Sequence, residues 1–341
     1  MGDLIRNVHQ TSGCELVGIY HPDVAPMADC IASYNIHPEC VHTDMVAALS
    51  QSGADVAIVC STTATHASVA AAAFAANLHV IIEKPFATNV QEAQQIIDAA
   101  TMVNKLLAVN WPLAWYPSHV TAQRIIAAGT IGDPVEVHYY GGNRGPLHHG
   151  ADKLETSLAS QQERKLTAWW YDPALGGGSL RDYLGYGTTL GTWFLNGQEP
   201  ITVTAVTDQP AANVVDEHAI VVCRYAAGLS KFETRWGTFT DPWTIQPQPK
   251  CGFVIVGTRG TVSSYDYDDF ITLQTEDNPQ PYAYPVELLT SPYTNVIEHM
   301  HAVLQRGIPL HKPLTPEIGR IGQRITDAAI ESIIEGRTVT Y

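Results

Sequence analysis

Short runs of β-branched residues alternate with helix-forming stretches through the first third of the chain. Runs such as Asp55-Val-Ala-Ile-Val-Cys60 are apolar without a break, which is typical of parallel strands covered by helices on both faces. The pattern predicts strands over 15–20, 55–60, 79–82 and 106–110, and helices over 25–34, 45–50, 66–76, 90–103 and 116–128. This is the spacing of a nucleotide-binding half, so we expect a doubly wound parallel sheet within residues 1–125.

The pattern changes after Gly132-Asp133-Pro134. Apolar and polar residues then alternate between turn residues, which indicates a large, mostly antiparallel sheet with one face exposed or used for association. Strands are expected over 135–140, 201–206, 218–225, 229–236, 253–257, 261–265 and 270–274, and helices over 179–195, 296–306 and 316–335. Residues 126–341 are therefore predicted to form a second, α+β domain, whose last helix can pack back on the first.

The composition excludes several classes of protein. The 19 Lys and Arg residues against 34 Asp and Glu residues give a net charge of −15, which repels nucleic acids and anionic lipid surfaces. The six cysteines lack paired CxxC spacing, and no apolar run reaches the roughly 18–20 residues that cross a bilayer. We therefore expect a soluble, cytoplasmic protein with reduced thiols and without a nucleic-acid or membrane partner.

A lysine stands where the third predicted strand ends, in the run His79-Val-Ile-Ile-Glu-Lys-Pro85. In an open parallel sheet, ligands bind outside the carboxyl ends of the strands, and Pro85 restricts the backbone at this turn. A surface lysine would usually have polar neighbours, whereas Lys84 follows a strand of buried type. Lys84 is therefore predicted to face a bound cofactor or substrate.

Four motifs in this order resemble the Gfo/Idh/MocA family, which comprises glucose–fructose oxidoreductase, inositol dehydrogenase and their relatives. They are the run 55–66, Glu83-Lys84-Pro85, the run Trp170-Tyr-Asp-Pro-Ala-Leu-Gly-Gly-Gly-Ser-Leu-Arg-Asp182, and the closing run 330–337. The resemblance covers essentially the whole chain. It implies a Rossmann-like dinucleotide-binding domain, a substrate-binding domain whose open sheet mediates oligomerisation, and hydride transfer on sugars, cyclitols or related polyols with NAD or NADP.

The amino terminus departs from the family pattern. The family opens with a strand and a GxGxxG loop that cradles the pyrophosphate, whereas residues 3–11 and 14–20 here look like the first helix and the second strand. Gly2 would be the last glycine of that loop. We expect a start placed too late or a shortened chain, because loss of a central strand would leave its neighbours' ladder groups unpaired.

Asp182 and Tyr186 are one helical turn apart, on one face of a helix entered through Gly176-Gly177-Gly178. The resemblance implies that Tyr186 is the proton donor or acceptor at the substrate oxygen, with Lys84 beside it. Asp182 would hold a substrate hydroxyl or orient Lys84. We expect the Lys84 ammonium to lower the pKa of the phenol from its usual value near 10. Taken alone, Tyr186 would be a packing residue and Asp182 a cap or a partner of Arg181.

Further residues are candidates for contact with NAD or NADP. The candidate cofactor-binding residues are Gly2, His21, Ser61, Thr62, Glu83, Lys84 and Asn110. His21 stands where a carboxylate would bind the adenosine ribose, which favours NADP unless Asp23 supplies that carboxylate. His66 is interpreted as an ordinary residue at a helix start rather than as a catalytic one.

Aromatic and histidine residues in the second domain offer two further possibilities. Trp170 is a candidate to stack on a sugar ring, together with Lys84, Asp182 and Tyr186 as substrate-binding residues, while the other tryptophans are interpreted as core. The pair His148-His149 lies in a polar segment, 141–162, that could be a lid or an exposed insertion. Two adjacent histidines supply too few ligands, so no metal site is expected.

The sequence therefore predicts an NAD(P)-dependent oxidoreductase that acts on the CH–OH group of a sugar, cyclitol or related polyol. A neutral polyol is preferred because the chain is acidic, and a homo-oligomer, dimer or tetramer, is expected through the second sheet. Two alternatives remain open: a non-catalytic regulator that binds dinucleotide or sugar, and a glycosidase that uses bound NAD. Retention of Lys84 together with Tyr186 argues against the regulator.

Overall fold

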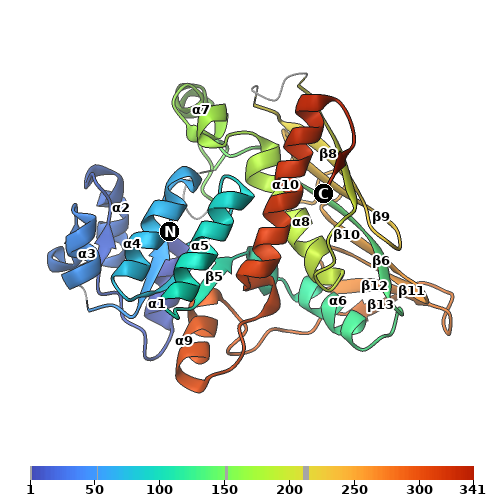
Figure 1. The fold of residues 1–341 in the computed structure, drawn as a ribbon, viewed down its shortest axis with the longest axis horizontal. Coiled ribbons are helices and arrows are strands. Elements are labelled where there is room, and N and C mark those ends of the chain that lie inside the picture. The colour runs from blue at the N-terminus through green and yellow to red at the C-terminus, as the bar shows by residue number, and fades with distance from the viewer. Residues whose placement is uncertain (1, 52, 150–152, 210–214) are drawn as a thin grey trace.

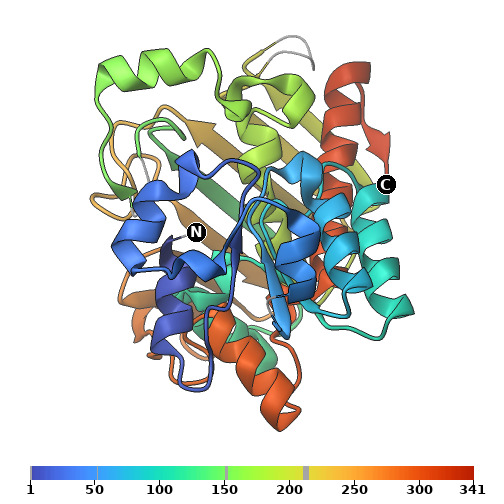
Figure 2. The same cartoon turned by 90° about the vertical axis from the view of Figure 1, so that its left-hand side faces the viewer.

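The computed structural model of the protein describes residues 2–51, 53–149, 153–209 and 215–341. The amino-terminal elements, blue to cyan in Figure 1, lie on one side of the molecule, and a large sheet lies on the other side. Two long helices, α8 (Ser179–Phe194) and α10 (Pro316–Glu335), stand between them. Figure 2 shows the amino-terminal elements in front of the broad sheet. The expected α/β architecture, a parallel sheet plus a large antiparallel one, is confirmed.

The amino-terminal part contains parallel strands flanked by helices. Its central sheet has the order β3-β4-β5, with parallel pairing throughout. The strands are β3 (Val56–Val59), β4 (His79–Glu83) and β5 (Leu107–Asn110). The helices are α1 (Gly2–Gln10), α2 (Ala28–Tyr34), α3 (Met45–Gln51), α4 (His66–Ala75) and α5 (Val90–Met102). Residues 80–82 of β4 are at most 1% exposed, which agrees with the unbroken apolar run in the sequence.

One expected strand is much shorter in the structure. The run 15–20 forms only β1 (Ile19–Tyr20), which pairs in parallel with β2 (Val41–His42). Cys14 and Leu16 instead pack against an apolar cluster that includes residues of α1. A strand extends as far as a partner offers backbone groups to pair with, and β2 offers two residues. The prediction for this run was right in type and wrong in length.

The second part is built around a nine-stranded sheet of order β13-β12-β11-β10-β6-β9-β8-β7-β14. Neighbouring strands are antiparallel, except for β6 and β9, which are parallel. The strands are β6 (Pro134–Asn143), β7 (Thr202–Thr207), β8 (His218–Arg224), β9 (Leu229–Trp236), β10 (Gly252–Gly257), β11 (Gly260–Tyr265), β12 (Phe270–Thr275), β13 (Tyr282–Pro285) and β14 (Val339–Thr340). The sequence pattern missed β13 and β14, because four and two residues are too few to show a period of two.

Helices α8 and α10 cover one face of this sheet, and residues of the strands alternate between that covered face and an exposed one. Helix α8 lies close to the strands because it carries glycines at its contacts. A Cβ atom on Gly187 would lie 2.6 Å from Tyr139 Cδ1, and one on Gly191 would lie 2.5 Å from Phe232 Cε1. The sequence of α8 therefore fixes its depth against the sheet, and with it the position of Asp182.

Two further helices connect the parts. Helix α6 (Pro117–Ala127) contributes to the core under the large sheet, whereas α9 (Val296–Arg306) packs with α1. Helix α10 packs on α8 and also contacts α5. The polar segment expected as a loop contains the end of β6 and most of α7 (Leu158–Lys165). Within the described ranges, no helix combines the length and apolar character that crossing a membrane requires, and none of the six cysteines forms a disulfide.

Candidate functional site

Lys84 lies at the carboxyl end of β4, against the first turn of α8. Its Nζ donates to Oδ1 of Asp182 at 3.1 Å and to the Asp182 carbonyl oxygen at 3.4 Å. The two side chains are 18% and 10% exposed, so the ion pair is largely withdrawn from water. A strand of the first part and a helix of the second thus meet in one buried pair of charges, which brings together two residues 98 positions apart.

The electrostatics of this pair fix the charge of Lys84. Burial disfavours the ammonium, but the charge and hydrogen bond of Asp182, with smaller contributions from Tyr186 and Glu83, outweigh it and raise the pKa of Lys84. Lys84 is therefore held as a cation at neutral pH. Such a fixed charge can stabilise negative charge that develops on a nearby oxygen.

Tyr186 projects from α8 beside this pair. Nζ of Lys84 lies 5.1 Å from the centre of the Tyr186 ring. Burial raises the pKa of Tyr186, Lys84 opposes this shift, and Asp182 adds to it. The expectation that Lys84 would bring this pKa below its usual value is therefore wrong, because desolvation outweighs the ammonium. The phenol is protonated at neutral pH and can donate a proton or a hydrogen bond.

Two aromatic rings hold Tyr186 in place. Trp111 meets its ring edge-on with centroids 5.7 Å apart, and Tyr183 lies at 4.7 Å. Trp111 is 2% exposed, and a Cβ atom on Gly185 would lie 2.4 Å from its Cη2 atom. The sequence interpretation of Trp111 as a core residue is correct, but it missed that this residue forms the wall behind Tyr186.

A buried carboxylate fixes the start of α8. Oδ2 of Asp216 accepts hydrogen bonds from Ser179 Oγ at 2.6 Å and from the Leu180 backbone nitrogen at 3.0 Å. Gly178 has a φ of 108°, which side chains rarely adopt, and a Cβ atom there would lie 2.4 Å from Asp216 Oδ1. Burial raises the pKa of Asp216. The glycine before α8 thus makes room for the carboxylate that caps the helix.

Glu83 and Asn110 sit at the ends of neighbouring strands. Nδ2 of Asn110 donates to Oε1 of Glu83 at 2.6 Å, and Oε2 of Glu83 accepts weakly from the Lys84 backbone nitrogen at 3.3 Å. Among the described residues, the buried Oδ1 of Asn110 and the buried Nε1 of Trp111 have no hydrogen-bond partner. Buried polar atoms are rarely left unpaired, so these two atoms are available to a ligand at the strand ends.

The other candidate cofactor residues follow the same edge of the first part. Gly2 opens α1, His21 follows β1, and Ser61 and Thr62 follow β3. Nδ1 of His21 lies 2.7 Å from the Asp23 carbonyl oxygen, so this side chain is engaged within its own turn. Within the described ranges, none of these four residues hydrogen-bonds to Lys84 or Asp182. Their role in cofactor binding stays a prediction.

His66 is a structural link rather than part of the ion-pair site. It is 1% exposed, with Nδ1 3.2 Å from the Phe86 carbonyl oxygen and Nε2 3.1 Å from the Ser61 carbonyl oxygen. Burial lowers its pKa. The ring therefore links the turn after β3 to the turn after β4 and fixes these two turns relative to each other at the carboxyl edge of the sheet.

Trp170 supports the turn before α8. Its carbonyl oxygen accepts from the Gly178 backbone nitrogen at 2.9 Å, and its ring lies against Trp169 with centroids 4.9 Å apart. In the part of the chain that the structure describes, the ring makes no aromatic contact with Tyr186. Stacking of Trp170 on a sugar stays a prediction.

A pair of tyrosines beside the site was missed by the sequence interpretation. The hydroxyls of Tyr116 and Tyr267 lie 3.1 Å apart. Burial raises the pKa of Tyr116, and the proximity of Tyr267 and Tyr186 adds to the shift. The two residues are 151 positions apart, and no spacing rule joins the residue before α6 to the turn after β11. Only the fold brings these phenols near Tyr186.

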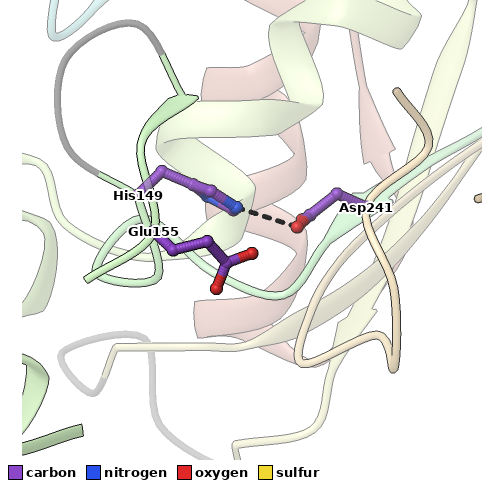
Figure 3. A group of neighbouring side chains, drawn as sticks. All are labelled: His149, Glu155 and Asp241. Carbon is purple, nitrogen blue, oxygen red and sulfur yellow. Dashed lines mark hydrogen bonds and ion pairs between the residues drawn. The ribbon is translucent and has the colours of Figure 1, made fainter. Parts of the chain in front are cut away.

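The His148-His149 segment contains a group of possible metal ligands. Figure 3 shows the side chains of His149, Glu155 and Asp241 grouped together. Their ligand atoms lie within 4.8 Å of one another. However, the Arg144 guanidinium already occupies the same cluster: Nε donates to Asp241 at 2.7 Å, and Nη2 contacts Glu155 and lies 3.1 Å from His149 Nε2. A metal ion would have to displace this cation, so these contacts instead tie Arg144, His149 and Glu155 to Asp241 in the loop after β9.

Comparisons with known proteins agree with this architecture. Residues 2–111 match a family described as "Oxidoreductase family, NAD-binding Rossmann fold", and residues 119–263 match the "GFO/IDH/MocA C-terminal domain". Inositol 2-dehydrogenase 1 of Saccharopolyspora erythraea is 30% identical over 129 residues, which is 38% of each chain. A 1,5-anhydro-D-fructose reductase of Ensifer adhaerens is 24% identical over 61% of this chain and 56% of its own. The chain spans 38–57% of the length of the first curated relatives it matches.

Solved structures share the fold over nearly the whole chain. The aldose-aldose oxidoreductase of Caulobacter crescentus, complexed with glycerol, has a TM-score of 0.78 at 17% identity and covers 99% of this chain and 95% of its own. An oxidoreductase of Agrobacterium radiobacter in complex with NAD+, L-tartaric acid and magnesium has a TM-score of 0.75 at 18% identity, over 99% and 94% of the two chains. With both halves of the sequence matched and the ion pair at their junction, the chain belongs to the Gfo/Idh/MocA family of oxidoreductases with an NAD-binding Rossmann fold.

Proposed function

We propose that this protein is an NAD(P)-dependent oxidoreductase that transfers hydride to or from a carbinol carbon of a sugar, cyclitol or related polyol. The observation that carries the proposal is the buried Lys84–Asp182 pair, with Tyr186 beside it, at the junction of the two parts. A fixed cation can stabilise the charge that develops on a carbonyl oxygen during reduction, and a protonated phenol can supply the proton. The relatives named above include enzymes that act on inositol and on 1,5-anhydro-D-fructose, which supports a polyol or sugar substrate.

The residues at the strand ends fit a nicotinamide cofactor. The unpaired, buried Oδ1 of Asn110 is an acceptor suited to a carboxamide N–H. The Nδ2 atom of Asn110 is bonded to Glu83, and Lys84 is the residue directly after Glu83. The nicotinamide ring, when bound, supplies or accepts the hydride. His21 in the place of a ribose-binding carboxylate favours NADP, and Asp23 would favour NAD, so both cofactors belong in the first assay.

The protein's own groups would handle the proton and the charge. In the reductive direction, negative charge develops on the substrate oxygen as hydride reaches the carbon. The Lys84 ammonium stabilises that charge, and the Tyr186 hydroxyl donates the proton that completes the carbinol. In the oxidative direction Tyr186 would act as the phenolate, the form in which proton donation leaves it, and would accept the proton of the carbinol. Asp182 keeps Lys84 oriented and charged throughout.

Turnover with a panel of polyols and sugars, followed at the reduced-nicotinamide absorbance band, tests the proposal. Lys84→Met should lower kcat about 10²–10³-fold, the loss expected when a fixed donor to a developing oxyanion is removed. Lys312→Met is the matched control, because Lys312 is exposed and lies outside the site. Binding of cofactor without turnover by the wild type would show a regulator instead. Release of sugar from an aryl glycoside without net change of cofactor would show a glycosidase.

Assembly through the large sheet is part of the same proposal. Its uncovered face carries exposed apolar side chains on several strands, including Val206 on β7 at 60%, Leu229 on β9 at 53% and Phe270 on β12 at 47%. Exposed apolar residues gathered on one face favour association. We expect analytical ultracentrifugation to detect a homo-oligomer. Leu229→Glu should shift the equilibrium between oligomer and monomer toward the monomer. A wild type that sediments as a monomer would contradict this.

A further inference from the structure

A cavity lies beside the ion-pair site. Its volume is ≈ 290 Å³, and its walls come from the turns after β3 and β4, from α5, from α8 and the segment before it, and from α10. It touches the site only through neighbours, since Pro85 follows Lys84 and Arg181 precedes Asp182. Among the described residues, Lys84, Asp182 and Tyr186 are not part of its lining. Residues of both parts of the molecule therefore line this cavity, which is separate from the proposed reaction site and next to it.

The size of the cavity limits its occupant. Pockets for drug-sized ligands usually hold roughly 300–1,000 Å³. A volume at the lower edge of this range suits a molecule of monosaccharide size rather than a whole dinucleotide.

Arg181 gives this cavity a cationic group with spare donors. Its Nη1 donates to the carbonyl oxygen of Pro173 at 2.9 Å, and Pro173 is itself part of the wall. Among the described residues, the remaining guanidinium N–H groups have no hydrogen-bond partner. A guanidinium presents its donors in a planar fork that matches a carboxylate, and charged hydrogen bonds of this kind are stronger than neutral ones.

Hydroxyl-binding groups stand on other walls of the cavity. Glu92 uses Oε2 to accept from Thr88, by Oγ1 at 2.6 Å and by the backbone nitrogen at 3.3 Å, which leaves Oε1 without a partner among the described residues. Gln323 donates through Nε2 to Asp327 at 3.0 Å, which leaves its carbonyl oxygen as an acceptor. Thr63 is 6% exposed and also belongs to the lining. These oxygens can receive the hydroxyl hydrogens of a polyol.

Neither of the two nearby carboxylates forms a hydrogen bond with Arg181 among the described residues. Glu92 is bonded to Thr88, and Oδ2 of Asp327 accepts from the Val90 backbone nitrogen at 2.6 Å. Asp327 lies close enough to Arg181 for the guanidinium to lower its pKa, although burial raises it overall. No hydrogen bond joins Arg181 to either carboxylate in the part of the chain that the structure describes, so its fork stays available to a ligand.

We propose that this cavity is a second binding site, for a small polyhydroxylated carboxylate of sugar-acid type. Arg181 binds the carboxylate, and Thr63, Glu92 and Gln323 bind the hydroxyls. Occupancy places the ligand against Pro85 and Arg181, the chain neighbours of the ion pair, without filling the space between Lys84 and Tyr186. The site is independent of turnover and can be tested on the protein without cofactor.

Calorimetric titration of the full chain with D-gluconate, and with D-glucitol as the same carbon chain without a carboxylate, tests this site. The wild type should bind D-gluconate more tightly than D-glucitol. Arg181→Met should weaken D-gluconate binding at least about tenfold, the loss of one charged hydrogen bond, and should leave D-glucitol binding unchanged. Arg259→Met is the matched control, because Arg259 also donates to a single carbonyl, that of Gly129, away from the cavity. Melting temperatures check that both variants fold.

Lys84→Met separates this site from the proposed reaction site. It should retain D-gluconate binding while losing turnover, because Lys84 lies outside the cavity lining. Three results would overturn the proposal: no D-gluconate binding by the wild type, unchanged binding by Arg181→Met, or loss of binding in Lys84→Met, which would place the ligand at the ion pair. None of them bears on whether the protein transfers hydride.

Discussion

The buried Lys84–Asp182 pair makes a quantitative prediction about stability. Two unit charges 3.1 Å apart attract by about 5 kcal/mol at an effective dielectric constant of about 20. Removing one partner of a buried pair typically costs about 3–5 kcal/mol, because the other charge stays buried and uncompensated. Asp182→Asn keeps the shape and one acceptor for the ammonium, so we expect a loss at the lower end, about 3 kcal/mol at pH 7. Urea unfolding followed by tryptophan fluorescence measures it.

The pH dependence of this loss follows from the pKa of Lys84. In the wild type, Asp182 raises that pKa above the unfolded value, so the stability contributed by the pair is present below about pH 10 and is lost above it. In Asp182→Asn, burial acts without the largest contribution that opposes it and depresses the pKa of Lys84, so the folded variant binds fewer protons than its unfolded chain. The variant therefore gains stability as pH rises. The difference in unfolding free energy between the wild type and Asp182→Asn should be largest near neutral pH and should become smaller above about pH 10.

Two controls make the result decisive. The double replacement Lys84→Met with Asp182→Leu removes both charges and should recover most of the lost stability, because an apolar pair needs no compensation. Asp277→Asn, in an exposed loop, should stay within about 0.5 kcal/mol of the wild type. A loss below about 1 kcal/mol in Asp182→Asn, or a double variant less stable than the single one, would refute the reasoning.

Two further predictions concern α8. Gly185→Ala should destabilise the protein by about 1–3 kcal/mol, although alanine usually stabilises a helix relative to glycine, because the new Cβ atom would lie 2.4 Å from Trp111. Near-ultraviolet circular dichroism should report the displaced Trp111 ring. A variant as stable as the wild type would show that Trp111 can move. Because burial raises the pKa of Asp216, the wild type should lose stability as pH rises from about 4 through that raised pKa. In Asp216→Asn, melting temperatures taken between pH 4 and 7 should no longer show this loss of stability with rising pH. If the loss stayed unchanged in the variant, groups other than Asp216 would be its cause.

Much of the architecture was predictable from local pattern. The helices expected over 296–306 and 316–335 have those bounds in α9 and α10, and β8, β9 and β12 lie within a residue of the predicted runs. These elements are long and bury one regular face, so a single stretch of sequence carries the signal. The run 15–20 failed because strand length depends on the partner, and β14 failed because two residues show no period.

The sequence by itself determined that a lysine ends a buried strand and that Asp182 and Tyr186 share one face of a helix, because both facts depend on neighbours along the chain. Tertiary structure decided the rest. It brought Lys84 to Asp182, set Tyr116 against Tyr267, and buried Tyr186 so deeply that desolvation, not the ammonium, governs its pKa. Charge interactions and burial depend on distances through space, which no spacing in the sequence encodes.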